Sequence, residues 1–170
     1  MGPRDTGRYA STLGMVVAWA GGVIGVVTSA GLIILAVRDA RTERVPVRWA
    51  RAVTAVAVGG LAVGGVLGRE WGALAGAGAG ASLVTGIQLV PYGLHARSGQ
   101  EAIGRADVRL GVPFGATLGW FGLGFTVVGF ALALVAGLVA SAALRRRRLP
   151  FVPFLAGGHA AALVWALWRL

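Results

Sequence analysis

Long uncharged apolar runs, separated by short clusters of charged residues, dominate the chain. The runs cover residues 13–37, 52–68, 71–94, 110–144 and 149–168. A helix needs roughly 20 such residues to cross the hydrocarbon core of a bilayer. The pattern therefore predicts several membrane-spanning helices and leaves no polar stretch long enough for a separate soluble domain.

The run at 110–144 is too long for one span. Its 35 residues would form a helix of about 52 Å, against a hydrocarbon core of roughly 30 Å. The segment 119–124 is glycine-rich and offers a turn, and its Trp120 and Phe121 suit a membrane interface. Splitting the run there predicts six spans, at about 13–37, 50–68, 71–94, 108–120, 123–144 and 150–168.

The charges orient these spans. Arginine supplies all 16 basic residues, and in the six-span arrangement twelve of them fall on one side. The twelve are Arg38, Arg41, Arg44, Arg48, Arg51, Arg97, Arg105, Arg109 and Arg145 to Arg148. Because positive residues favour the cytoplasmic side, the N-terminus is predicted to lie outside. A five-span arrangement would lose this asymmetry.

The expected fold is thus an all-α polytopic membrane protein with six transmembrane helices. Residues 1–12 form a short outer tail and residues 13–170 a single six-helix domain. Glycines recur every four residues, as Gly60, Gly64 and Gly68 and again as Gly72, Gly76 and Gly80, which predicts close helix packing.

Composition changes this picture little. The chain is 56% hydrophobic, and its net charge of +10 comes from the arginines between the spans, so no nucleic-acid partner is expected. The cluster from Arg145 to Arg148 is instead suited to binding anionic lipids, and each arginine contributes roughly 1 kcal/mol of binding free energy.

The absence of cysteine excludes disulfides and thiolate zinc sites. The histidines and acids form no cluster at metal-ligand spacing, so neither metal nor cofactor is expected.

Acidic side chains are scarce, and two of the six lie at predicted span ends. Asp39 ends the first span and Asp107 begins the fourth, so both are predicted at the cytoplasmic edge of the membrane. An ionisable residue in such a place is a candidate functional residue. The charge pattern alone leaves an alternative open, in which each aspartate simply pairs with a neighbouring arginine.

Three motifs accompany these aspartates. The first is an aspartate followed by a short polar, basic stretch and Val-Pro, from Asp39 to Pro46. The second reads Gly104-Arg105-Ala106-Asp107-Val108-Arg109-Leu110, and a looser third is LPFVPFLAGG at 149–158. In this order they resemble the type IV prepilin peptidases and their preflagellin peptidase relatives. Ala106 replaces the second glycine of that family's Gly-x-Gly-Asp motif.

The resemblance implies an aspartic endopeptidase of the cytoplasmic (inner) membrane, in a short form without a methyltransferase portion. Asp39 and Asp107 would be catalytic, and the substrate would be a prepilin-like membrane protein that loses its basic leader peptide at the cytoplasmic face. Glu43 and Glu101 are candidates for attracting the leader, although ion pairs with nearby arginines are the alternative for each. Gly104 and Ala106 are candidates for close approach of the substrate backbone.

The chemistry of two neighbouring carboxyl groups supports this assignment. At a low-dielectric boundary they cannot both ionise cheaply, so one keeps its proton near neutral pH. The charged group acts as a base on water and the protonated group donates to the scissile carbonyl. Which aspartate starts as the base stays open, because the pair titrates as a unit.

Two other functions are open. A rhomboid-like serine intramembrane protease would use Ser82 and His159, both about ten residues into their spans. A non-catalytic transporter or an inactive relative would use the two aspartates as ion or proton sites. Transporter sites usually lie near the bilayer midplane, whereas these carboxylates are predicted at one face.

Overall fold

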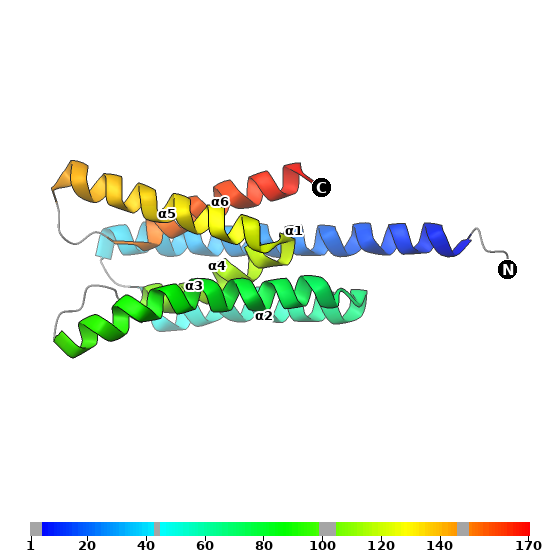
Figure 1. Cartoon of the computed structure of the whole chain (residues 1–170), viewed down its shortest axis with the longest axis horizontal. Coiled ribbons are helices and arrows are strands. Elements are labelled where there is room, and N and C mark those ends of the chain that lie inside the picture. The colour runs from blue at the N-terminus through cyan, green and yellow to red at the C-terminus, as the bar shows by residue number, and fades with distance from the viewer. Residues whose placement is uncertain (1–4, 43–44, 99–104, 146–149) are drawn as a thin grey trace.

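The computed structural model describes residues 5–42, 45–98, 105–145 and 150–170, with side chains left out at 5–18, 91–92, 94–98 and 105–107. This part of the chain is helical and contains no strand (Figure 1). Its helices are α1 (Asp5–Thr42), α2 (Val47–Gly68), α3 (Trp71–Ser98), α4 (Arg105–Phe121), α5 (Leu123–Leu144) and α6 (Val152–Trp168). The all-α prediction is confirmed, and the run at 110–144 does divide into two helices.

In the described part of the chain, four helices are long and apolar enough to cross a membrane: residues 19–42 of α1, α2, residues 71–90 of α3, and α5. α6 is apolar but shorter, and α4 is in neither group. The protein is therefore a multi-pass membrane protein, whereas six complete spans and an outer N-terminus stay predictions.

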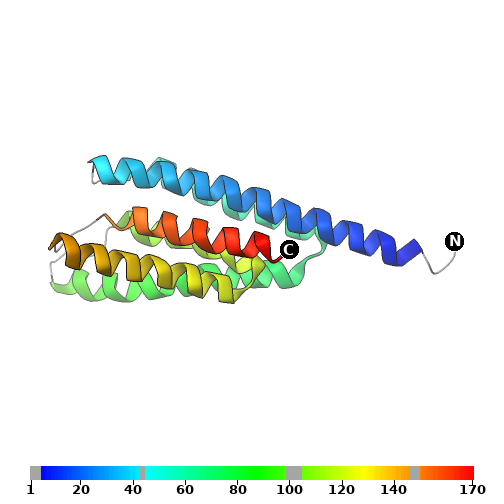
Figure 2. The same cartoon turned by 90° about the horizontal axis from the view of Figure 1, so that it is seen from above.

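α1 already begins at Asp5, so residues 5–12 of the predicted tail are helical, and their place outside the membrane stays a prediction. No proline separates Asp5 from the apolar run, so the helix continues outward from it. With 38 residues α1 is about 57 Å long. Its N-terminal part extends beyond the other helices (Figures 1 and 2).

Consecutive helices run in opposite directions, so the bundle has two different ends (Figure 1). At one end, here called the turn end, only Arg69 and Glu70 join α2 to α3, and Gly122 alone joins α4 to α5. The other end, here called the loop end, carries the C-termini of α1, α3 and α5 and the N-termini of α2, α4 and α6. The connections there are longer, at residues 43–46, 99–104 and 145–151.

The two short turns depend on left-handed backbone. Arg69 caps α2 at φ 57°, and its N–H bonds the carbonyls of Gly65 and Val66. Gly122 has φ 131° and ψ 149°, a conformation that essentially only glycine adopts. The glycine-rich turn predicted at 119–124 is thus confirmed and centred on Gly122.

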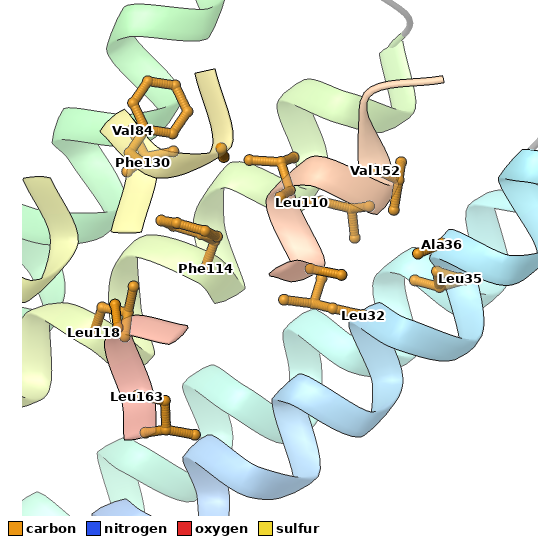
Figure 3. Packing of buried hydrophobic residues seen from close by; sticks show 14 of the residues in the cluster. Leu32, Leu35, Ala36, Val84, Leu110, Phe114, Leu118, Phe130, Val152 and Leu163 are labelled. Atoms are coloured by element: carbon orange, nitrogen blue, oxygen red, sulfur yellow. The ribbon is translucent and has the colours of Figure 1, made fainter. Parts of the chain in front are cut away.

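α4 is the central helix and contacts all five others. From Leu110 to Trp120 its residues are buried, except for Val112, which is half-buried. Leu110, Phe114 and Leu118 share a core with Leu32 and Leu35 of α1. Figure 3 shows this core, with Val152 at the start of α6 beside Leu110.

Glycines allow α3 and α4 to touch backbone to backbone. A Cβ added to Gly80 would collide with the Gly115 carbonyl oxygen, and one added to Gly76 would collide with that of Gly119. The packing role predicted from the glycine spacing is confirmed at these positions. Gly60 also lies close to a neighbouring helix, against Ile24 of α1.

The same prediction is wrong at Gly64 and Gly72, where an added Cβ would meet nothing within 4 Å. Residues four apart share a helix face, so Gly64 lies on the face of Gly60 and Gly72 on the face of Gly76. What differs is the level along the helix: Gly76 lies opposite Gly119, and α4 ends at Phe121, before the level of Gly72.

Candidate functional site

Asp39 is the last residue of a buried stripe along one face of α1, at the loop end. The stripe contains Thr28, Ser29, Leu32, Leu35, Ala36 and Asp39, at the three- and four-residue spacing of one helix face. Val37, Arg38 and Ala40 beside it are exposed. Asp39 itself is only 7% exposed, and it interacts with its surroundings. The helix therefore turns this carboxylate towards the bundle rather than towards the solvent.

Asp107 occupies the first turn of α4, at the same end of the bundle. Its side chain lies outside the described part, and so does the separation of the two carboxyl groups. The adjacent turns are described: Leu35, one turn before Asp39, and Leu110, one turn after Asp107, belong to the same core. Figure 3 shows Leu35 and Ala36 on the side of α1 that faces Val152 and Leu110. The backbone positions of the two aspartates thus lie at one end of one core.

The other predicted site residues belong to the connections and to the first turn of α4 at this same end. Glu43, Glu101 and Gly104 lie outside the described residues, and Ala106 is described only as part of the first turn of α4. Exposed arginines surround this end, namely Arg38, Arg41, Arg48, Arg51, Arg109 and Arg145.

A polar network in the bundle core connects three helices through His159 of α6. The histidine is fully buried; its Nδ1 lies 2.8 Å from Ser29 Oγ of α1 and its Nε2 lies 2.5 Å from Thr117 Oγ1 of α4. Thr117 donates its hydroxyl proton to the Pro113 carbonyl at 2.7 Å, so it accepts from Nε2–H. Ser29 then donates to Nδ1, and every polar atom of the imidazole is satisfied with the ring neutral.

This network argues against the Ser82–His159 pair expected of a serine protease. Ser82 is exposed on α3, and α3 makes no contact with α6 in the described part of the chain. The hydroxyls that bond His159 are Ser29 and Thr117, which sequence reasoning missed. The only available signal was that Ser29 shares the helix face of Asp39, and this spacing does not identify a partner on another helix.

We expect Thr117→Val to lower the free energy of unfolding by about 1–3 kcal/mol, because it leaves the buried Nε2–H of His159 without an acceptor. Thermal or denaturant unfolding of the purified protein in detergent measures the change. Thr54→Val is the matched control, since the half-buried Thr54 hydroxyl bonds only Ala50 of its own helix. Equal effects of the two changes would contradict a cross-helix role for Thr117.

Comparison with known proteins adds one finding. The sequence model described as the type IV leader peptidase family matches residues 26–144. The matched region contains Asp39 and Asp107 and ends before α6, so the LPFVPFLAGG segment lies outside it. No curated protein and no solved structure matches the chain.

Proposed function

Since this chain belongs to the type IV leader peptidase family, we propose that it is an aspartic endopeptidase that removes the basic leader of prepilin-like membrane proteins. Asp39 and Asp107 are the proposed catalytic residues, acting at the cytoplasmic face of the cell membrane.

The observation that carries this proposal is the burial of Asp39. Carboxylates are seldom this buried, and at 7% exposure Asp39 is turned into the bundle at the loop end, where the first turn of α4 also lies. The family match includes this residue and also Asp107, in the first turn of the helix that packs against α1. The burial of Asp39 and the family match therefore both point to the loop end of the bundle as the proposed site.

The proposed reaction is hydrolysis by a pair of carboxyl groups that share one proton. The ionised carboxylate removes a proton from water, whose oxygen bonds to the scissile carbonyl carbon, while the protonated carboxyl donates to the carbonyl oxygen. The tetrahedral intermediate then collapses: the C–N bond breaks and the leaving amine takes a proton. The two aspartates exchange roles in this second step, and neither is consumed.

The position of the site suits a substrate that is half polar and half apolar. A basic leader stays in the aqueous phase, and the apolar segment after it enters the bilayer, so the bond between them lies at the membrane interface. Glu43 and Glu101, on the loops of the same end, are proposed to attract the leader. The arginines exposed there are proposed to hold the enzyme against anionic lipids.

The direct test is to incubate the purified protein in lipid vesicles with a synthetic prepilin-like peptide, which carries a basic leader and an apolar segment. We expect one cut between the two parts, identified by mass spectrometry. Ser82→Ala and Ser29→Ala should cut the same bond, because the proposed reaction uses no serine. Loss of the cut in either folded serine variant, or ion flux through the vesicles without any cut, would contradict the proposal.

A further inference from the structure

The side-chain amide of Gln88 is buried against α4, one helical turn from Asp107 in the direction of the turn end. Gln88 of α3 is 3% exposed, and neither its Oε1 nor its Nε2 has a hydrogen-bond partner among the described residues. A Cβ added to Gly111 of α4 would collide with Gln88 Oε1, so the amide lies directly on the surface of α4. Gly111 follows Asp107 by four residues, about 6 Å along the helix.

Packing alone does not account for this glutamine. A carboxamide has an acceptor oxygen and a donor NH₂ group, and burying both without partners destabilises the folded protein. Thr85, one turn earlier on α3, also has a buried hydroxyl without a partner, and an added Cβ on Gly111 would lie 3.3 Å from its Oγ1. The α3–α4 contact therefore holds a local group of unsatisfied polar atoms next to the proposed site.

Prolines interrupt the hydrogen bonding of both helices at this level. Pro91 of α3 has no N–H, so the Ile87 carbonyl cannot receive the usual intrahelical bond from it. Pro113 of α4 likewise has no N–H to donate to the Arg109 carbonyl. Both helices are thus weakened within one turn of Gln88, and the backbone itself offers acceptors there.

We propose that Gln88 is a substrate-binding residue, whose amide pairs with the peptide backbone of the substrate just after the scissile bond. The inference rests on the proposed function, because it assumes a peptide that reaches the site. Cleavage requires an accessible carbonyl, so the substrate must be extended there and its backbone N–H and C=O groups lack helical partners. A side-chain amide supplies one acceptor and one donor, which match those two groups.

The depth of Gln88 indicates which part of the peptide it binds. Gln88 lies on the bundle side of Asp107, away from the loop end, and the apolar segment of the substrate extends in that direction. Water is scarce at this depth, so a peptide group there gains more from a protein partner than it would at the surface. Gly111 leaves room for the amide in its present position, because a Cβ there would meet Gln88 Oε1.

The first experiment measures binding and stability together. Gln88→Met keeps the length of the side chain and removes the amide. In an Asp107→Asn background, in which cutting is slow compared with binding, we expect the Kd for the synthetic peptide to rise roughly ten-fold. The melting temperature should stay the same or rise, because an unsatisfied buried amide is gone. In the otherwise native enzyme, KM should rise more than kcat falls.

Thr126→Val is the matched control, since Thr126 of α5 also has a buried hydroxyl without a partner but lies at the turn end. It should leave Kd unchanged. An unchanged Kd in Gln88→Met would overturn the proposal, and so would a melting temperature that falls along with binding, because that result indicates a structural role.

A second experiment identifies the backbone group. Peptides in which one amide after the cut is replaced by an ester lack a single N–H donor. At one position we expect the ester to weaken binding to the protein that retains Gln88 and to leave binding to the Gln88→Met variant unchanged. The loss of affinity from the ester and the loss from Gln88→Met are then not additive. Additive losses at every position would overturn the pairing. If the native enzyme binds the peptide but does not cut it, the proposed function fails while this coupling is still measured.

Discussion

Asp39→Asn and Asp107→Asn should each lower the rate of leader cleavage by about 10²- to 10⁴-fold while the protein still folds and inserts. Asparagine matches aspartate in size but cannot take a proton from water or give one to a carbonyl. Because the two carboxyl groups act as a unit, the double variant should be little worse than either single one. Cleavage of the synthetic peptide in vesicles, normalised to the amount of folded protein, measures the loss.

Glu70→Gln provides the control, because Glu70 is an acid in the short α2–α3 connection at the turn end. It should cut at the native rate. A shared proton also predicts that the rate of the native enzyme passes through a maximum as pH changes, because both the charged and the protonated carboxyl are needed. Normal cleavage by either aspartate variant would remove the basis of the aspartic mechanism.

Gly80→Ala should lower the free energy of unfolding by about 3 kcal/mol, the upper part of the range for overpacked cores. The added methyl collides with the Gly115 carbonyl oxygen and lies 3.0 Å from Thr126 Oγ1. The first of these is backbone, so it cannot rotate away, and α3 and α4 must separate. Since α4 carries Asp107, cleavage should fall as well. Unfolding in detergent measures the stability change.

Gly78→Ala makes the same chemical change on the same helix, at a position where nothing lies within 4 Å. Alanine is the better helix former by about 1 kcal/mol, so this variant should be as stable as the native protein or more stable. Opposite signs for two glycines only two residues apart would identify the α3–α4 contact as the cause. A loss of stability in both variants would contradict it.

Local features of the fold were predictable from the sequence. The helices follow from apolar runs, and the division of the run at 110–144 follows from its length. The turn at Gly122 follows from the clustering of glycines, one of which has a backbone conformation that other residues rarely adopt. The inward position of Asp39 extends the stripe that Leu32 and Leu35 begin.

Features that join distant helices were not predictable in this way. Gly72 and Gly76 lie on the same face of α3, but only Gly76 meets α4, because α4 ends at Phe121, and the spacing of glycines along one helix does not show where its neighbour ends. The serine-protease alternative pairs His159 with Ser82, whereas the hydroxyl groups that bond His159 come from α1 and α4. Gln88 was not recognised, since a lone glutamine in an apolar run gives no sign of whether its amide is satisfied.

The single residue between α4 and α5 has a consequence for biogenesis. α4 is neither long nor apolar enough to count among the candidate spans, whereas α5 has a mean hydropathy of 2.4. α4 begins with Arg105, Asp107 and Arg109, and these charges make it poorly suited to partition into lipid by itself. The one-residue link makes it move together with α5. We therefore expect α4 and α5 to enter the membrane as one hairpin, so that the helix bearing Asp107 depends on α5 for its delivery.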